Sequence, residues 1–278
     1  GHVLLAHAEP LLRDAVRLRH AHAAAGEMPL GSGALSASTL PLRRDVAAAQ
    51  LGLSRLTQNS IDAVADRDFV LDLVHACVTL GLHLSRLGED VVIWSSSEFG
   101  FVRLSDRIST GSSLMPQKRN PDVAELIRAR SGRGLAAYVG LAAVLKGLPL
   151  AYDRDLQEDR AHLVPAVSSA GECLEAARLM VEVLVFDRDR MAAACGDPDL
   201  LATDTAEAMV AGGAAFREAH AEVGRQVREG GHRPPWDAAG SLSRRDLVGG
   251  PHPRRVAARA RALARQAAGV GRWAAAGR

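Results

Sequence analysis

Apolar residues recur every three or four positions along residues 70–94, and this repeat constrains the fold more than any other feature of the sequence. The positions are Val70, Leu73, Cys77, Leu80, Leu84, Leu87, Val91 and Trp94. Such spacing places side chains on one stripe of an α-helix, as in coiled coils. At 1.5 Å per residue the predicted helix is about 37 Å long. A rod of this length needs long neighbouring helices to cover its apolar stripe.

Two further segments have the length expected of such neighbours. A helix is predicted over 121–146, where Pro121 suits the first turn, and another over 157–186. The apolar positions of the second helix show the same spacing: Val167, Ala170, Leu174, Ala177, Val181 and Leu184. The sequence therefore predicts an all-α protein with a bundle of long helices. Because seams of this length often need more cover than one chain provides, we expect self-association, with a monomeric bundle as the alternative.

Shorter predicted elements surround the bundle, and Asn59 is predicted to cap the helix that carries the 70–94 seam. The remaining expected helices cover 2–24, 43–51, 188–195, 203–212, 214–229 and 254–275, with Gly- and Pro-rich loops over 26–42 and 230–253. We expect a central helical bundle over 1–186 and a small C-terminal helical domain over 187–278. The helical pattern starts directly after Gly1, so the beginning of the protein is expected to be missing.

Composition limits the possible functions. The 278 residues are 47% hydrophobic and 24% charged, with a net charge of +2, which excludes extensive disorder and argues against a dedicated nucleic-acid binder. We expect a cytoplasmic protein, because no stretch reaches the roughly 18 uncharged apolar residues of a membrane span and no signal-peptide pattern is present. The three cysteines are far apart and predict neither a disulfide framework nor a metal site. The Arg-rich segment 254–275 is interpreted as a solvated helix face.

One polar segment between two predicted long helices contains the candidate chemistry. Residues 109–121 read STGSSLMPQKRNP. Gly111 permits unusual backbone angles, and Ser112 and Ser113 offer hydroxyls beside backbone N–H groups. Lys118 and Asn120 lie at the entrance of a helix, whose N-terminus favours anions. A carboxylate-binding loop and a polar connector capped by Asn120 both fit these residues.

The segment GSSLMPQKRNPD resembles the signature loop of the fumarase/aspartase/argininosuccinate lyase superfamily, written GSSxMPxKxNP. Other segments are similar to argininosuccinate lyases in particular: MPLGSGAL (28–35), NSIDAVADRDF (59–69), WSSSEFGFVRLSDRISTGSS (94–113) and LKGLPLAYDRDLQEDR (145–160). The resemblance runs from residue 1 to about 229, and the tail beyond it is expected to be shorter than in the family.

The resemblance implies reversible elimination of fumarate from argininosuccinate to give arginine, with no metal or organic cofactor. It also implies a homotetramer in which each active site draws residues from three subunits. Ser112 matches the catalytic loop serine, whose role as base or donor stays open. Glu125 matches the Glu that polarises a catalytic histidine of another subunit. The positions that match substrate-binding residues of the family are Ser113, Lys118, Asn120, Tyr152, Gln157 and Arg160.

The chain departs from the family pattern at three places. Arg160 stands where the family usually has Lys, and Asp153 stands where it usually has Asn. The family histidine lies in a THLQ segment that precedes the position of Gly1, and none of the ten histidines has that context. Two alternatives therefore stay open: a catalytically silent helical scaffold, since the family includes lens crystallins, and another fumarate-forming lyase of the superfamily.

Overall fold

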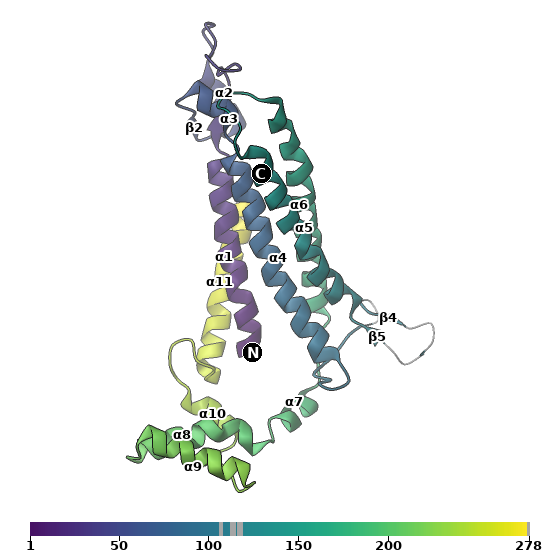
Figure 1. Cartoon of the computed structure of the whole chain (residues 1–278), viewed down its shortest axis with the longest axis vertical. Helices are drawn as coiled ribbons and strands as arrows, with labels where there is room; N and C mark the ends of the chain where they lie inside the picture. Colours follow the sequence, from purple (N-terminus) through teal and green to yellow (C-terminus); the bar gives the residue numbers. More distant parts are fainter. Residues whose placement is uncertain (106–107, 112–114, 116–118, 277–278) are drawn as a thin grey trace. The chain divides into compact units, whose positions relative to one another are not determined.

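The computed structural model describes residues 1–105, 108–111, 115 and 119–276, and it is mainly helical (Figure 1). The chain forms two compact units that alternate along the sequence. The bundle unit comprises Glu9–Ile93 and Leu104–Leu184, and the C-terminal unit comprises Gly1–Ala8, Trp94–Arg103 and Val185–Arg278. The predicted all-α class is confirmed. The division into a central bundle over 1–186 and a small C-terminal domain over 187–278 stays a prediction.

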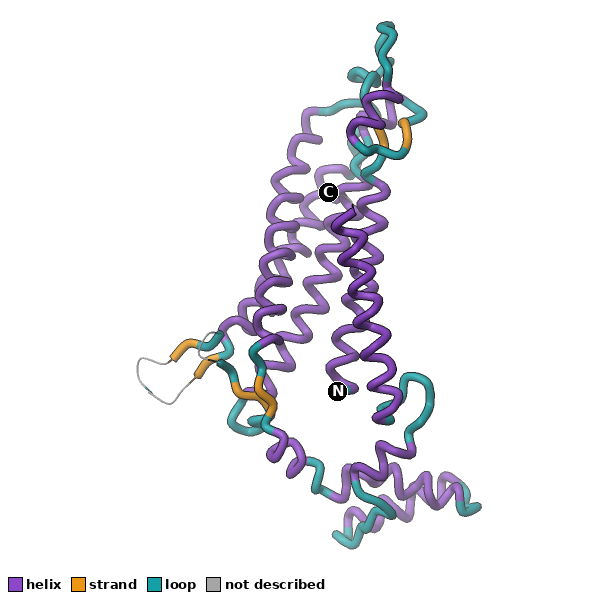
Figure 2. The backbone as a smooth tube through the Cα atoms, turned by 180° about the vertical axis from the view of Figure 1, so that it is seen from behind, coloured by secondary structure: helices purple, strands orange, loops and turns teal. Residues whose placement is uncertain are grey.

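Four long helices run side by side in the bundle unit (Figures 1 and 2). They are α1 (His2–Ala24), α4 (Asp68–Ser95), α5 (Asp122–Leu145) and α6 (Asp159–Glu182). The predicted seam lies on α4, and six of its eight positions are buried: Val70, Cys77, Leu80, Leu84, Leu87 and Val91. Burial raises the pKa of the Cys77 thiol to about 11, as expected for an unreactive core cysteine.

The helix predicted to start at Asn59 is divided in two, so the expectation of a single helix was wrong. The side chain of Asn59 accepts hydrogen bonds from the N–H groups of Ile61 and Asp62 and starts α3 (Ser60–Ala65). Asp66 then has extended backbone (ψ 128°), and its carboxylate accepts the N–H of Asp68 at 2.7 Å. The second cap starts α4 afresh.

The helix predicted over 157–186 is shorter at both ends than expected. Residues Arg154–Glu158 form a 3-10 helix, η1, before α6 begins at Asp159. At the other end, β6 (Val185–Phe186) pairs antiparallel with β3 (Val102–Arg103) in the C-terminal unit. Pairing of the strands β3 and β6 therefore replaces the last predicted turn of the helix.

Short elements complete the bundle unit. β1 (Glu27–Met28) pairs parallel with β2 (Arg55–Leu56), and α2 (Arg44–Leu51) lies between them in the sequence. The guanidinium of Arg44 donates to the carbonyl oxygens of Met28 at 2.9 Å and Thr57 at 3.1 Å, which fastens α2 to this pair. β4 (Thr110–Gly111) pairs antiparallel with β5 (Arg119–Asn120).

The C-terminal unit consists of shorter helices, as predicted, followed by one long helix. They are α7 (Arg188–Ala194), η2 (Pro198–Leu201), α8 (Ala202–Ala211), α9 (Phe216–Arg228), α10 (Ala238–Arg244) and α11 (Pro253–Ala276). Ala206, Ala219 and Val223 form the core between α8 and α9. The prediction of an uninterrupted loop over 230–253 was wrong, because Asp237 caps α10 by accepting the N–H of Gly240 at 2.8 Å.

A buried carboxylate ties the segment after α9 to α8. Asp204 is 3% exposed, and its carboxylate accepts hydrogen bonds from Trp236 Nε1 at 3.0 Å, Ser241 Oγ at 2.7 Å and Arg245 at 2.7 Å. The adjacent Thr205 hydroxyl lies 2.8 Å from the ring nitrogen Nε2 of the buried His232. Because buried polar groups need partners, these contacts fix the fold of residues 230–246.

By length and composition, α4 is apolar enough to cross a membrane. Within the bundle unit it is the central helix, and it buries side chains from Val70 to Val91. Core helices of soluble proteins pass the same test, so this helix is weak evidence for a membrane span.

Close packing of α4 against α5 depends on Gly88. A Cβ atom at Gly88 would lie 2.7 Å from the carbonyl oxygen of Ala124. We expect Gly88→Ala to lower the free energy of unfolding by about 2 kcal/mol, since the two backbones must separate. Gly81→Ala is the matched control on the same helix, because its Cβ would lie 3.4 Å from Ser131 Cα. Urea denaturation checks the pair, and equal stability of the two variants would contradict this packing.

Candidate active site

A short β-ladder forms the base of the signature loop. Thr110 pairs with Asn120 and Gly111 with Arg119 across β4 and β5. The Thr110 hydroxyl also donates to the carboxylate of Asp122, the first residue of α5. Asn120 is thereby held next to the start of α5. The predicted site residues Ser112, Ser113 and Lys118 lie outside the described residues.

Glu125 lies one turn into α5, where its N–H donates to the carbonyl oxygen of Pro121 at 3.0 Å. Its side chain is exposed on the bundle unit. The pKa of Arg128 is raised, mainly by its hydrogen bond to Glu89 and to a smaller degree by the charge of Glu125. Asn120 and Glu125 therefore stand together at the N-terminal end of α5, and we call them the loop half-site.

The structure brings together Tyr152 and Gln157, two of the predicted substrate-binding residues. The side-chain amide of Gln157 donates to the Tyr152 hydroxyl oxygen at 2.6 Å, and both side chains are exposed. The preceding Ala151 has φ +81°, a left-handed conformation that a residue with a Cβ rarely adopts. Such strain is often found at functional sites. Tyr152, Gln157 and the exposed Arg160 in the first turn of α6 form what we call the tyrosine half-site.

Two features near the tyrosine half-site, one ion pair and one buried oxygen, were not expected from the sequence. Arg67 Nε donates to the Asp159 carboxylate at 2.7 Å, and these two side chains are 19% and 16% exposed. This ion pair anchors the start of α6 to the break between α3 and α4. One carboxylate oxygen of Asp153 is buried and has no hydrogen-bond partner among the described residues. Both residues of the ion pair lie in segments that resemble the family, and that was the available signal.

The two half-sites lie at opposite ends of α5. Asn120 and Glu125 are at its beginning, whereas Tyr152 and Gln157 follow its end. The 24 residues of α5 correspond to about 36 Å at 1.5 Å per residue. A small-molecule substrate of the kind implied by the resemblance is far too short to span this distance. Within one copy of the chain, the structure therefore does not bring the two predicted groups together.

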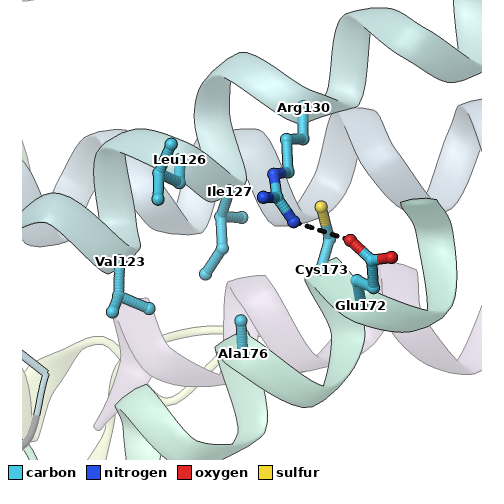
Figure 3. Close-up of a pocket in the computed structure, with 7 residues that line it drawn as sticks. All are labelled: Val123, Leu126, Ile127, Arg130, Glu172, Cys173 and Ala176. Carbon is cyan, nitrogen blue, oxygen red and sulfur yellow. Dashed lines mark hydrogen bonds and ion pairs between the residues drawn. The ribbon is translucent and has the colours of Figure 1, made fainter.

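A hollow of about 110 Å³ lies between α5 and α6 (Figure 3). Its lining residues are Val123, Leu126, Ile127, Arg130, Glu172, Cys173 and Ala176. The ion pair between Arg130 and Glu172 (2.6 Å) is its main polar feature. None of the predicted site residues that the structure describes lines it, so we do not assign it to the site.

Comparison with known proteins was made for the whole chain. The model of the lyase family matches residues 1–134, and the model of the argininosuccinate lyase C-terminal region matches residues 199–234. The chain is 46% identical over 287 residues to argininosuccinate lyase of Anaeromyxobacter sp. (strain K), covering 94% of this chain and 61% of that protein. It is 49% identical over 227 residues to the enzyme of Frankia casuarinae, covering 82% and 49%.

Two solved structures are also similar to this chain in fold. EDDS lyase in complex with formate has a TM-score of 0.88 and 25% identity, and the match covers 100% of this chain and 62% of that one. A class II fumarase from Schistosoma mansoni, with a TM-score of 0.61 and 16% identity over 80% of this chain and 54% of that one, shares the fold.

The relatives differ in how much of the chain they match. The match covers 94% of the chain in the Anaeromyxobacter protein and 82% in the Frankia protein. The chain spans 61% and 49% of the length of these two proteins. Two family models in the expected order, and 44–49% identity to argininosuccinate lyases over most of the chain, agree with the signature loop. The chain therefore belongs to the argininosuccinate lyase family.

Proposed function

We propose that this chain acts in the reversible elimination of fumarate from argininosuccinate, which yields arginine. The loop half-site carries the proposal. The β4–β5 ladder holds Asn120 just before α5 begins, and Glu125 lies in the first turn of that helix. The 46% identity to an argininosuccinate lyase supports the choice of substrate. A variant of the structurally similar EDDS lyase binds fumarate, which supports the choice of product.

The reaction removes a proton from the succinyl carbon next to a carboxylate. The electron pair of that C–H bond forms the C=C bond of fumarate as the C–N bond breaks, and the leaving guanidine nitrogen takes up a proton. Ser112 is the residue of the loop that is proposed to take part in this proton transfer, as base or as donor. Lys118 and Asn120 hold the carboxylate on which negative charge accumulates, Lys by its charge and Asn by a directed N–H.

The other proposed roles follow the family match. Glu125 is proposed to hold, in the tautomer needed for proton transfer, the family histidine of another subunit, whose THLQ segment precedes the position of Gly1. Ser113, Tyr152, Gln157 and Arg160 bind substrate, and Arg160 offers a planar fork of donors where Lys would offer a point charge. No cofactor is part of this proposal.

We also propose a cytoplasmic homotetramer. Half-sites about 36 Å apart form a complete site only if several copies meet. Large apolar residues on α5 and α6 are 42–62% exposed and need cover: Leu126, Leu135, Val139, Val164, Val167, Leu174 and Val181. Three of them, Val167, Leu174 and Val181, belong to the predicted seam. Light scattering coupled to size exclusion tests the assembly, and a monomer at micromolar concentration would contradict it.

Fumarate release from argininosuccinate, followed by ultraviolet absorbance, tests the proposed activity. We expect fumarate formation when the wild-type chain is supplied with the upstream segment that carries the family histidine, and we expect Ser112→Ala to be about a thousandfold slower under the same conditions, because the loop serine takes part in the proton transfer. Ser113→Ala, which alters a proposed binding contact in the same loop, is expected to lose less.

Three outcomes would contradict this proposal. Equal rates for wild type and Ser112→Ala would indicate a contaminating lyase. No fumarate, together with no thermal stabilisation by argininosuccinate, would favour the silent scaffold, because a binding-competent site raises the melting temperature. Stronger stabilisation by small dicarboxylates than by argininosuccinate would favour another lyase of the superfamily.

A further inference from the structure

Arg190, in the first turn of α7, binds a tight turn that follows α4. Its Nε donates to the carbonyl oxygen of Phe99 at 2.7 Å. One terminal nitrogen donates to the carbonyl oxygens of Ser97 at 2.7 Å and Glu98 at 3.3 Å. All four residues belong to the C-terminal unit. A single guanidinium thus binds three successive carbonyl groups.

Gly100 makes room for this guanidinium. It has φ +59°, and a Cβ at this position would lie 2.7 Å from Arg190 Nε. Its N–H donates to the carbonyl oxygen of Ser96 at 2.7 Å, which closes the turn. Any side chain at position 100 would be strained and would also displace Arg190. The turn and the arginine are therefore matched to each other.

The turn leads directly into the segment that carries the loop half-site. The carbonyl oxygen of Phe101 accepts the N–H of Asp187 at 2.9 Å, and Val102 pairs with Phe186 in the β3–β6 ladder. Only residues 104–109 separate this ladder from β4, which begins at Thr110. The chain that enters the signature loop is thus held by the short segment 185–190.

We propose that Arg190 is a positioning residue for the fumarate-forming reaction, acting by ordering the turn and the β3 strand that precede β4, the strand that pairs with Asn120. This inference rests on the proposed function. Arg190 is not proposed to touch substrate, and it acts on residues 97–103, which precede β4 in the sequence. Small displacements of reacting groups are costly, since a shift of about 1 Å can lower a rate by about a hundredfold.

Hydrogen exchange tests the anchoring without any ligand. In Arg190→Ala we expect the amides of 96–103 and 108–111 to exchange at least about tenfold faster than in the wild type, because the turn opens more often. Arg188→Ala is the matched control, since it removes the same charge from the start of the same helix. Unchanged exchange at 108–111 in Arg190→Ala would overturn the proposal.

Kinetics separate positioning from a merely structural role. We expect Arg190→Ala to lower kcat for argininosuccinate about tenfold and to change KM less than about twofold. Arg190→Lys should not rescue kcat, because one ammonium group cannot replace the fork of donors that binds the three carbonyls. Gly100→Ala should reproduce the defect, and the double variant with Arg190→Ala should lose less than the sum of the two, since the clash disappears.

The outcomes distinguish this inference from the proposed function. Unchanged kcat in a variant whose 96–111 segment exchanges faster would overturn the positioning role and leave the proposed function intact. A wild-type chain that forms no fumarate would remove the proposed function and, with it, the kinetic role of Arg190. Hydrogen exchange would still decide whether Arg190 orders the segment.

Discussion

A mixture of two inactive variants, Asn120→Ala and Tyr152→Phe, is expected to recover about a quarter of the wild-type activity. Each substitution alone should slow fumarate formation about a hundredfold, because each removes a donor from the proposed site. The two positions lie at opposite ends of α5, so a complete site must take them from different copies. In randomly mixed oligomers, half of the copies at each end are intact, and about one site in four is intact at both ends.

The mixing experiment contains its own control. The variants are unfolded and refolded together, or kept apart and combined only in the assay. Recovery should occur only in the first case, since subunits must exchange. A mixture of Asn120→Ala with Glu125→Gln, which alter the same half-site, recovers nothing if both residues reach the site from one copy. Absence of recovery in the refolded mixture of Asn120→Ala and Tyr152→Phe would contradict a site shared between copies.

Replacement of Asp204 is expected to have the largest effect on stability. Asp204→Asn should lower the free energy of unfolding of the C-terminal unit by about 3 kcal/mol, because a buried network then loses a charged partner. The asparagine oxygen can serve Trp236 and Ser241, but its NH₂ group then faces the guanidinium of Arg245, which donates as well. Urea denaturation followed by circular dichroism measures the change. Glu207→Gln, an exposed carboxylate on the same helix, is the control and should change little.

The pH dependence of this effect follows from the pKa of Asp204. Burial raises the pKa of the carboxyl, but hydrogen bonds from Trp236, Ser241 and Arg245 outweigh burial, so the pKa lies below its ordinary value. A lowered folded-state pKa means that the stabilisation is complete above the unfolded-state pKa, near 3.9, and is lost as pH falls through the folded-state value. The stability difference between wild type and Asp204→Asn should therefore be constant above about pH 5 and shrink below about pH 4. A difference that grows at low pH would contradict the assigned network.

Periodic apolar spacing explains what could be predicted of the fold. The α4 seam and the long neighbours α5 and α6 follow from side-chain burial every three or four residues, which leaves a clear pattern in the sequence. On α6 the predicted helix forms, but its apolar seam is only partly buried in a single copy. The small residues Ala170 and Ala177 are buried, whereas Leu174 and Val181 are exposed. The spacing identifies which residues tend to be buried. It does not identify whether the same chain or another copy buries them.

Contacts made by single polar side chains could not be predicted in the same way. The restart of the helix at Asp68, the capping of α10 by Asp237 and the pairing of Arg67 with Asp159 each depend on one or two side chains. Such contacts have no period in the sequence. Arg67 and Asp159, moreover, become neighbours only after the chain folds. The same holds for the proposed site. Its residues were predicted by resemblance of motifs, and the structure places those that it describes at the two ends of one helix.

The length of α5 also links substrate concentration to assembly. In the proposed assembly each copy contributes two incomplete half-sites, so a ligand that bridges both half-sites would bind only copies that have already associated. By mass action such a ligand favours the assembled form, by an amount that grows with its concentration above its dissociation constant. Under the proposed function, argininosuccinate would then stabilise the association of subunits. Dilution of the protein would reduce turnover per chain more steeply at low substrate concentration than at high substrate concentration.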